Sequence, residues 1–394
     1  MRIPRPLTIL ALLPLLLGGL LVAAPRPAAA QGAACFQETG FCIQGRFLAY
    51  WQANGGLARN GFPLSTERQE TLEDGNTYTV QYFERVRMEY HPENPPPYDV
   101  LLGQFGRRIL LEDYVVAREN YPYAVAPTAA QSGQTFFPAT GHNISPLFLD
   151  YWQANGGLAQ FGYPITEERW DTLLTGANAC CRTQYFERAR FEYHPENAGT
   201  PYPILLGQFG RRILAENALL TGPTGQLFAS NEQVRGQLGR PTGPAIESDG
   251  AAQAFERGLM LYEGAGRRIF VLCGDPQAGT LVTSGQYPTE RQFPAFADTW
   301  QEGDDPGGGA GPTAGRYLPR RGFGKVWREN PEGVKGCVGY ATTPGETGYR
   351  IVTQQFAGGF MLTDPQGRIY VIPTFFGKCC GLGGSYQRYA APMR

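Results

Sequence analysis

The sequence predicts a mainly β protein with short α-helices, built from four imperfect tandem repeats that pack in one pseudo-symmetric β assembly. Long blocks of sequence occur twice along the chain, and a shorter skeleton taken from them occurs twice more. The composition, with 52 Gly and 32 Pro in 394 residues, favours many turns and short strands over long helices. Propeller-like and solenoid-like packing of the repeats both stay open at this point.

Residues 1–30 have the pattern of an export signal peptide. Arg2 and Arg5 provide a positive start, Leu7–Val22 is almost entirely apolar, and Ala28–Ala30 provides the small residues that a signal peptidase requires. The apolar run is shorter than the roughly 20 residues of a membrane-spanning helix, and no later stretch is as apolar. The sequence therefore predicts a mature chain without a transmembrane segment, secreted and either extracellular or associated with the cell surface.

The charge balance gives no electrostatic reason to expect nucleic acid as a partner. The chain holds 34 Lys and Arg against 35 Asp and Glu, and the signal segment contributes only basic residues to this count. Binding to nucleic acid or to an anionic membrane depends on an excess of basic residues. The mature chain is slightly acidic, so neither partner is predicted.

The eight cysteines all follow the signal segment, and an exported chain meets oxidising conditions, so disulfides are expected. Cys35 and Cys42 are the predicted pair, because their separation closes a small loop at the start of the first repeat. Lipid attachment at Cys35 is the disfavoured alternative, since Gly32 stands where such a signal carries an aliphatic residue.

Two adjacent cysteine pairs occur, Cys180-Cys181 and Cys379-Cys380. A disulfide between neighbours strains the peptide that joins them, so each of these residues is expected to find a partner elsewhere. A metal site is the other interpretation of such pairs. No His and no second Cys pair stands at the spacing of zinc sites, so no metal is predicted.

Two copies of the repeat are nearly identical over long stretches. The segment FLAYWQANGGLARNGFPLS begins at Phe47 and returns as FLDYWQANGGLAQFGYPIT from Phe148. Two further blocks recur at slightly larger offsets, QYFERVRMEYHPEN from Gln81 and LLGQFGRRIL from Leu101, with counterparts from Gln184 and Leu205. Similarity of this length is the signature of a repeat architecture.

A short skeleton marks two fainter copies. It consists of a Gly-aromatic-Pro turn, then Gln-x-Phe, then an apolar residue five positions after that Phe. The turns in chain order are Gly61-Phe62-Pro63, Gly162-Tyr163-Pro164, Gly239-Arg240-Pro241 and Gly339-Tyr340-Ala341. The Gln and Phe are Gln81 and Phe83, Gln184 and Phe186, Gln253 and Phe255, and Gln354 and Phe356.

These anchors divide the chain into consecutive segments. They are the signal peptide 1–30, repeat 1 at 31–120, a linker at 121–134, repeat 2 at 135–218, repeat 3 at 219–274, a flexible insertion at 275–315, and repeat 4 with the C-terminal tail at 316–394. The linker consists of Pro, Ala and polar residues, and the insertion contains a run of Asp, Pro and Gly, so both are candidate hinges.

Each large copy is predicted to contain a short helix, a turn and a meander of two or three strands. The segments from Phe47 and Phe148 are apolar at helical spacing and end at Asn-Gly-Gly, which closes a helix. Ser145-Pro146 is expected to start the second helix, with Ser as the cap. The later pattern alternates as in a strand, and Asp74-Gly75 and Asp249-Gly250 predict hairpins. One such unit buries little surface, so the copies are expected to pack together.

The sequence contains none of the common catalytic signatures, and neither catalytic residues nor cofactors are predicted. His91 and His194 precede Pro-Glu-Asn in the first two copies. A metal role there with Glu93 or Glu196 competes with a turn closed by Pro and Asn, and the turn is favoured. His142 has no counterpart in other copies and is the candidate partner of a nucleophile if the chain is a hydrolase.

Three recurring glutamates, Glu84, Glu187 and Glu256, follow the Phe of the skeleton and suggest the paired carboxylates of a glycosidase. A catalytic site is usually built once, whereas a residue that recurs in several copies more often serves the fold of each copy. These glutamates are therefore interpreted as parts of the scaffold.

Four aromatic residues are the candidate ligand-binding side chains: Tyr50, Trp51, Tyr151 and Trp152. Wide planar rings stack on sugar rings, and a repeated aromatic platform suits a polymer through avidity. The alternative is that the rings fill the gap between helix and sheet, and for the two Trp residues this packing is favoured. The unrepeated loops are the other region expected to carry specificity.

The Gly-aromatic-Pro turn followed by Phe-Glu-Arg-Gly resembles the LGFP repeat, most closely at Leu238-Gly239-Arg240-Pro241 and Phe255-Glu256-Arg257-Gly258. That family occurs in exported proteins of bacteria with complex cell walls and is thought to hold its carrier to the envelope. The first two copies depart from it by an added helix and the HPEN turn, and the fourth has Ala341 in place of Pro. The resemblance implies envelope association and leaves the ligand open.

Together these observations predict a secreted, non-catalytic module of the bacterial cell envelope that binds or anchors to cell-wall polysaccharide or another envelope component. A structural or adhesive surface protein that binds another protein is the first alternative. An unrecognised hydrolase is the second.

Overall fold

The computed structural model describes residues 32–117, 126–170, 182–274, 278–282, 295–304, 306–373 and 385–390. The predicted signal peptide 1–30 and the adjacent cysteine pairs at 180–181 and 379–380 lie outside these residues. The described chain is mainly β with short helices and several antiparallel sheets, so the predicted class is confirmed. In the part of the chain that the structure describes, no helix has the length and apolar character needed to cross a membrane.

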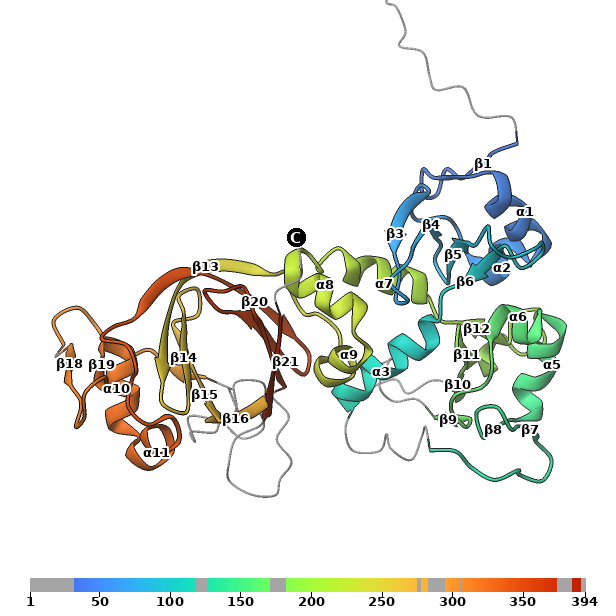
Figure 1. The fold of residues 1–394 in the computed structure, drawn as a ribbon. Coiled ribbons are helices and arrows are strands. Elements are labelled where there is room, and N and C mark those ends of the chain that lie inside the picture. Colours follow the sequence, from blue (N-terminus) through green and yellow to red (C-terminus); the bar gives the residue numbers. More distant parts are fainter. Residues whose placement is uncertain are drawn as a thin grey trace, which may run out of the picture.

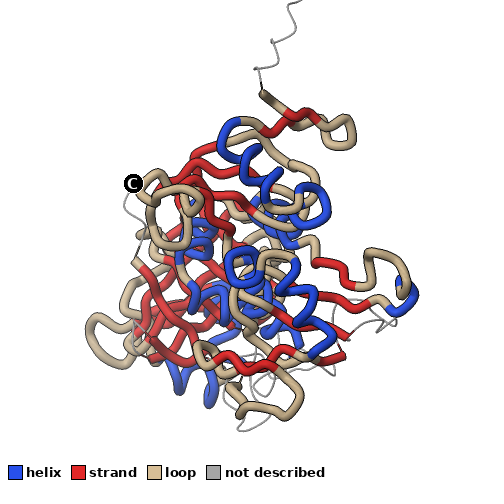
Figure 2. The backbone as a smooth tube through the Cα atoms, turned by 90° about the vertical axis from the view of Figure 1, so that its right-hand side faces the viewer, coloured by secondary structure: helices blue, strands red, loops and turns tan. Residues whose placement is uncertain are grey.

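Figure 1 shows two small sheets at one end of the molecule, a large curled sheet at the other, and four helices between them. These helices are α3 (Phe105–Ala117), α7 (Phe209–Asn217), α8 (Gly222–Ser230) and α9 (Glu232–Leu238). The predicted single assembly of all repeats is therefore not observed. Figure 2, which colours the same chain by secondary structure from the side, shows short helices and strands throughout the described residues.

Residues 34–117 form a hairpin, two short helices, a four-stranded sheet and a closing helix. The elements before α3 are β1 (Ala34–Cys35), β2 (Cys42–Ile43), α1 (Gly45–Ala53), α2 (Gly56–Asn60), β3 (Arg68–Thr71), β4 (Thr77–Tyr82), β5 (Arg87–Tyr90) and β6 (Val100–Leu102). The sheet order is β3-β4-β5-β6, and all neighbours are antiparallel.

Residues 135–217 repeat this order of elements. Before α7 they are β7 (Thr135–Phe137), β8 (His142–Ile144), α5 (Pro146–Ala154), α6 (Gly157–Phe161), β9 (Arg169–Trp170), β10 (Arg182–Tyr185), β11 (Arg190–Tyr193), the turn η1 (Pro195–Asn197) and β12 (Ile204–Leu206). The sheet order is β9-β10-β11-β12, also antiparallel.

The predicted helices are present as α1 and α5, with Phe47 and Phe148 as their buried residues. Each ends at an Asn followed by a glycine in the left-handed region, with φ of 85° at Gly55 and 106° at Gly156. A side chain other than glycine is strained in this conformation, which explains why both copies carry Asn-Gly-Gly.

Ser145 does not cap α5 as predicted. Pro146 is the first helical residue, but no side chain caps the helix, and the Ser145 hydroxyl donates to the Glu168 carboxylate instead. A hydrogen bond donated to a charged carboxylate is stronger than a neutral one, so Glu168 sets the orientation of the Ser145 hydroxyl.

Each unit contains more than the sequence predicts. Its sheet has four strands where two or three were expected, and an N-terminal hairpin precedes the helices. The block LLGQFGRRIL begins in the last strand of the sheet and continues into α3 or α7. The missing strands are only two or three residues long, too short to show an alternating pattern. Gly106 near the start of α3 weakens the helical pattern there.

The two closing helices dock on each other's units. The Arg107 N–H donates to the Glu187 carbonyl at 3.1 Å, and the Arg211 N–H donates to the Glu84 carbonyl at 3.0 Å. A Cβ at Gly106 would lie 1.8 Å from the Phe186 carbonyl oxygen, so this approach requires glycine. The tyrosine and phenylalanine side chains of both units meet in one core, namely Tyr82, Phe105, Tyr185 and Phe209.

The C-terminal part contains the curled sheet and its helices. After α9 the elements are β13 (Ile246–Phe255), β14 (Gly258–Glu263), β15 (Arg268–Gly274), β16 (Ala278–Val282), β17 (Phe296–Ala297), β18 (Gly307–Ala310), β19 (Tyr317–Arg320), α10 (Arg321–Glu329), η2 (Pro331–Lys335), α11 (Gly336–Val338), β20 (Thr347–Phe356), β21 (Gly359–Thr363), β22 (Ile369–Pro373) and β23 (Ser385–Tyr389).

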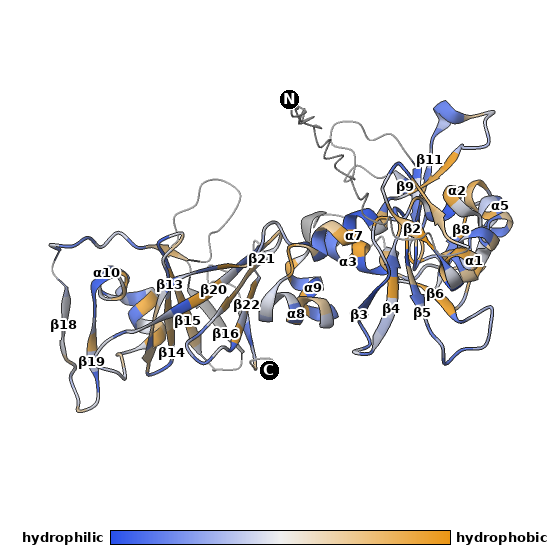
Figure 3. Ribbon diagram, turned by 90° about the horizontal axis from the view of Figure 1, so that it is seen from above, coloured by the Kyte–Doolittle hydropathy of each residue, from blue (hydrophilic) through white to orange (hydrophobic). Residues whose placement is uncertain are grey.

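The strand order is β14-β13-β20-β21-β22-β23-β16-β15-β17, and β14 also pairs with β15, so all strands but β17 pair in a closed circuit. Side chains alternate between its faces, as in any strand. Leu261, Phe270 and Ile351 share one apolar cluster, while Met260 and Val271 belong to another cluster formed with helices. Figure 3 shows hydrophobic and hydrophilic segments on α10, which buries one face on this sheet.

The helices of this part cover strands that are distant in sequence. Phe228 and Leu238 of α8 and α9 pack with Phe356 and Val371 of β20 and β22. The side chains of α10 and α11 pack instead with those of β13, β14 and β15, in a cluster that includes Phe255, Met260, Phe323, Trp327 and Val338. The predicted segments 219–274 and 316–394 are therefore interleaved.

The predicted hairpin at Asp249-Gly250 is wrong, whereas the one at Asp74-Gly75 is confirmed between β3 and β4. Asp249 and Gly250 lie inside the continuous strand β13, opposite Arg350 and Tyr349 of β20. The pairing with β20 replaces the hydrogen bonds that a local hairpin would have made. The interleaving of the two segments thus overrides the turn signal.

The two candidate hinges make contacts in their described parts. Residues 275–315 were expected to form a flexible loop but contribute β16, β17 and β18, because β15, β19 and β23 offer pairing edges. In the linker 121–134, Thr128 N donates to the Gly141 carbonyl and Gln131 N to Asn143 Oδ1. This end of the linker is thus held by the β7-β8 hairpin.

Candidate functional site

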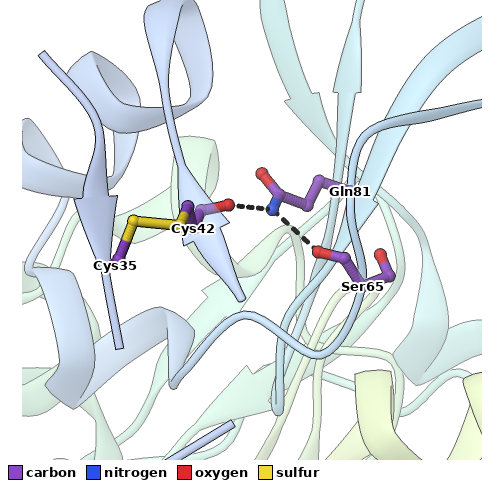
Figure 4. Close-up of a disulfide and its surroundings, with 4 residues drawn as sticks. All are labelled: Cys35, Cys42, Ser65 and Gln81. Atoms are coloured by element: carbon purple, nitrogen blue, oxygen red, sulfur yellow. Dashed lines mark hydrogen bonds between the residues drawn. A yellow bond between two sulfur atoms is a disulfide. The ribbon is translucent and has the colours of Figure 1, made fainter. Parts of the chain in front are cut away.

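The structure joins Cys35 and Cys42 by a disulfide, the pair that the sequence predicts, with an S–S distance of 2.03 Å. Gln81, from the recurring Gln-x-Phe, donates from Nε2 to the carbonyls of Cys42 at 2.8 Å and Ser65 at 2.9 Å (Figure 4). The disulfide joins the two strands of the first hairpin, and the glutamine attaches this hairpin to the sheet. A second disulfide joins Cys273 to Cys337, which sequence could not select among the possible pairings.

The predicted aromatic platform is half-buried in both copies. The Trp51 Nε1 donates to the Gly61 carbonyl at 3.1 Å and the Trp152 Nε1 to the Gly162 carbonyl at 3.2 Å. Each indole meets the Phe of the preceding hairpin edge to face, Phe36 in the first copy. These contacts favour the packing interpretation for the two Trp residues.

Tyr50 and Tyr151 are also half-buried, beside the apolar clusters of their units. Burial raises the pKa of the Tyr50 hydroxyl to about 12, and burial likewise raises the pKa of Tyr151. A half-buried phenol offers a ligand less surface than the exposed ring that a binding platform requires. The ligand-binding role of the four aromatic residues therefore stays a prediction.

The recurring glutamates close the recurring turns. Glu84 Oε2 accepts from the Phe62 N–H at 3.2 Å, and Glu187 Oε2 accepts from the Tyr163 N–H at 3.1 Å. The Glu256 carboxylate accepts from the Tyr340 N–H in the same way. This use of each carboxylate agrees with the scaffold interpretation.

The histidines pair with neighbouring carboxylates. The Nδ1 atoms of His91 and His194 lie 2.8 Å from Glu93 and Glu196, within the turns that Pro and Asn close. His142 is buried, and its Nδ1 lies 3.2 Å from Glu167, a partner that the sequence did not reveal. Among the described residues, no group of three or more His, Cys, Asp or Glu is placed to hold a metal ion.

A buried charge cluster lies between α3 and α7. Arg108 pairs with Glu112 at 2.9 Å, Arg212 pairs with Glu216 at 2.8 Å, and Arg212 also reaches Glu112 at 3.5 Å. Burial raises the pKa of Glu216 to about 8, and the nearby Glu112 carboxylate adds to the rise. The cluster belongs to the interface between the two N-terminal units rather than to an accessible site.

The strongest candidate site is a cavity of about 790 Å³ on the curled sheet. Its walls come from β13, β14, the turn before β15, residues 298–302, Pro306, the start of α10 and the segment before β20. This volume is within the range of small-molecule sites, which combine apolar rings with a few polar groups. Five of its eighteen lining residues belong to the unrepeated segment 275–315.

Two strained arginines line this cavity. Arg267 and Arg321 have φ of 49° and 48°, and they are the only non-glycine residues with positive φ in the described ranges. Glycine takes the corresponding position elsewhere: Gly367 before β22 for Arg267, and Gly45 and Gly222 at the first residue of α1 and α8 for Arg321. The left-handed region costs such a residue roughly 1–2 kcal/mol, and strain of this kind concentrates at functional sites.

Arg267 holds the segment that carries Trp300. Its guanidinium donates to the Trp300 carbonyl at 2.9 Å and lies 3.6 Å from the Asp298 carboxylate. The Asp298 N–H donates back to the Arg267 carbonyl at 2.8 Å, and Asp298 Oδ1 accepts from the Trp300 N–H. Glycine at this position could make none of the side-chain contacts.

Trp300 is half-buried and lies beneath the second strained arginine. The Arg321 Cζ atom is 5.8 Å from the centroid of the indole, within the range of a cation–π contact. The indole Nε1 is buried and has no hydrogen-bond partner within the described chain. An unpaired buried donor costs free energy, and a ligand oxygen would satisfy it.

Carboxylates complete the cavity. Glu346 is half-buried there, and burial raises the pKa of its carboxyl group, opposed by the charge of Arg321. Burial also raises the pKa of the Tyr262 hydroxyl, with a further rise from the Asp298 charge. The cavity thus surrounds one indole ring with hydroxyl, carboxylate and guanidinium groups, a set that can exchange hydrogen bonds with sugar hydroxyls.

The sequence did not predict the residues of this cavity. Trp300 lies in the segment predicted as a flexible insertion, and only the expectation that unrepeated loops carry specificity pointed toward it. The signal available in the sequence was an arginine at two positions where related segments have glycine. Its meaning depends on φ, which the sequence does not give.

The chain matches no protein-family model, and no curated protein and no solved structure is significantly similar to it. The assignment of function rests on the residues described above.

Proposed function

We propose that this protein is a secreted, non-catalytic component of a bacterial cell envelope whose cavity around Trp300 binds a cell-wall glycan or a related polymer. The observation that carries the proposal is the convergence on Trp300 of two arginines that replace glycine at strained positions. Strained residues persist where the surrounding structure holds them, and they concentrate at functional sites. Here Arg267 binds the backbone carbonyl of Trp300, and Arg321 lies over its indole ring.

The groups of the cavity suit a carbohydrate. The face of an indole packs on the apolar face of a sugar ring, and carboxylates and guanidinium groups bind its hydroxyls. Asp298 and Glu346 supply acceptors, while Arg267 and Arg321 supply donors. The mixture of both charges is expected for a neutral or weakly charged polyol rather than for a strong polyanion.

The four-copy organisation and the LGFP resemblance are part of the same proposal. Their support is one recurring contact, in which the Gln of Gln-x-Phe donates to the carbonyl two residues after the Gly-aromatic-Pro turn. The pairs are Gln81 with Ser65, Gln184 with Thr166, Gln253 with Thr343, and Gln354 with Gly243, at 2.8 to 3.3 Å. In the last two pairs the glutamine and the turn come from different predicted repeats.

The test is co-sedimentation of the mature protein with purified bacterial cell walls. The wild type is expected to pellet with the walls, and Trp300→Ala is expected to stay in the supernatant. Trp170→Ala is the control, because Trp170 is 65% exposed on β9 and lies outside the cavity. Equal sedimentation of wild type and Trp300→Ala, or no sedimentation of either, would reject the proposal.

The alternatives are separated by treating the walls first. Loss of binding after protease treatment indicates a protein partner and favours the adhesive function. Loss after digestion of the glycan indicates the polymer. Release of soluble sugar by the wild type during the incubation, reduced in the Trp300→Ala variant, would indicate a hydrolase.

A further inference from the structure

A second cavity, of about 400 Å³, lies where the N-terminal units meet the helices of the C-terminal part. Its walls come from the first sheet, from α3, from α9 and from Arg188 of the second unit. Helices α3 and α9 are in contact, and Figure 1 shows them side by side. Junctions between units are frequent places for ligand sites.

Arg235 of α9 is the most unusual group in this cavity. It is 5% exposed, and its Nη1 donates only to two carbonyls, those of Phe228 at 3.0 Å and Ala229 at 2.5 Å. Its Nε is buried without a hydrogen-bond partner, and no carboxylate within the described chain forms an ion pair with it. Burial lowers the pKa of Arg235, and the nearby charge of Arg108 lowers it further.

Arg188 is the second cation of the cavity that forms no ion pair with a carboxylate of the described residues. Its Nε donates to the Leu102 carbonyl at 3.2 Å and its Nη1 to the Leu158 carbonyl at 3.1 Å. Both bonds fix the guanidinium at the cavity wall, and no carboxylate of the described chain forms an ion pair with it. Arg188 and Arg235 thus present two guanidinium groups, without an ion-pair partner among the described residues, to one partly open cavity. The charges of Glu73, Glu112 and Glu232 raise the pKa of Arg235 only in part.

The other charged groups of the wall are already paired or stand at its rim. Arg87 binds Glu73 at 2.9 Å and Glu89 at 2.7 Å, and Arg108 lies 3.8 Å from Glu73. The Asp74 carboxylate accepts hydrogen bonds within its own turn, from Asn76 and Tyr78, and Glu232 is solvent-exposed at the start of α9. Arg107, which lies 3.3 Å from the Glu187 carboxylate, and His91, which lies between Glu89 and Glu93, line the same wall.

We propose that this cavity binds a small oxyanion, a phosphate or a carboxylate group, held between Arg188 and Arg235. Guanidinium groups match the geometry of both anions, and a low-dielectric wall strengthens the attraction. The leucines that line the cavity, Leu72, Leu101, Leu102 and Leu111, accommodate an organic remainder. Because Arg188 belongs to the second N-terminal unit and Arg235 to α9, the bound anion also ties α9 to that unit.

The test is calorimetric titration of the full mature chain with inorganic phosphate and with succinate at low ionic strength, alongside the melting temperature. Saturable binding of at least one anion and a rise in melting temperature are expected, since a ligand stabilises the state that binds it. Arg235→Met is expected to abolish the binding. Binding should weaken as salt is added.

A milder pair of variants protects the test from a folding defect in Arg235→Met. Gln104 lines the cavity in the sequence LLGQFGRR, and Gln208 occupies the identical sequence of the second unit, outside this cavity. Both side chains are solvent-exposed. Gln104→Glu adds one negative charge at the mouth of the cavity and should lower the affinity for the anion by about fivefold. Gln208→Glu should not change this affinity.

Three results would overturn the proposal. The first is no heat of binding with either anion. The second is equal binding by the wild type, Arg235→Met and Gln104→Glu. The third is binding of calcium instead of an anion, which would assign the cavity to Glu73, Asp74 and Glu232. None of these outcomes bears on wall binding through Trp300, so the two proposals fail separately.

Discussion

Pro241 forms a β-bridge with Phe356, in a different predicted repeat, whereas Pro63 bridges Phe83 of its own unit. The reciprocal bridge joins Phe255 to Ala341. The same turn and the same Phe thus meet in every case, but in the C-terminal part each partner comes from the other segment. The long strands β13 and β20 pair with each other and carry the chain from one segment to the other.

This exchange predicts which helices loosen when each Phe is truncated. Phe356→Ala should cost about 3–5 kcal/mol of the free energy of unfolding and raise amide hydrogen exchange in α8 and α9. Phe255→Ala should raise exchange in α10 and α11 instead. Exchange measured by mass spectrometry distinguishes the two patterns, and a response of each helix pair to the Phe of its own segment would contradict the interleaving.

The strained backbone of Arg267 predicts that its replacement by glycine affects wall binding but not the free energy of unfolding. Arg267→Gly, which copies Gly367 of the other turn, removes roughly 1–2 kcal/mol of strain and also removes the contacts to Trp300 and Asp298. The free energy of unfolding should therefore change little, while wall binding in the sedimentation assay should fall. The matched control is Gly367→Ala, which should lower stability and leave wall binding intact. Retained wall binding by Arg267→Gly would show that the strained Arg267 is not needed for wall binding.

The disulfides predict unequal losses of stability. Cys273 and Cys337 are 64 residues apart in sequence, and Cys35 and Cys42 only 7. A longer closed loop restricts the unfolded chain more, so replacing Cys273 and Cys337 with Ser should cost about 2–4 kcal/mol, and more than the same change at Cys35 and Cys42. Denaturant unfolding of both double variants gives the comparison, and equal losses would refute it.

The raised pKa of Glu216 predicts that the free energy of unfolding decreases as the pH rises. Its pKa is about 8 in the folded protein against 4.5 for an ordinary glutamate. Between these values the folded state keeps a proton that the unfolded state has released, so the free energy of unfolding decreases with pH, by at most about 1.4 kcal/mol per unit. Glu216→Gln removes this dependence. Urea unfolding at pH 5 and pH 8 should show the wild type losing stability relative to the variant, and parallel behaviour would show that the pKa of Glu216 is not raised.

Local patterns in the sequence were sufficient for the features that short stretches of chain decide. The helices at Phe47 and Phe148, the left-handed glycines after them, the Asp74-Gly75 hairpin and the Cys35–Cys42 disulfide all depend on residues close in sequence. The extra strands and the helices α3 and α7 were not predicted, because they are too short or too interrupted to show a hydrophobic periodicity.

Tertiary structure decided everything that depends on which copy of a motif meets which. Asp249-Gly250 carries the same turn signal as Asp74-Gly75, yet it lies in the continuous strand β13. Pairing with β20 offers more hydrogen bonds than a local turn. Trp300 is a candidate ligand residue only because Arg267 and Arg321 lie around it in the folded chain. The sequence by itself determined the repeat, the turns and the mainly β class. The exchange between segments and both cavities arise from contacts between distant residues, which no local pattern encodes.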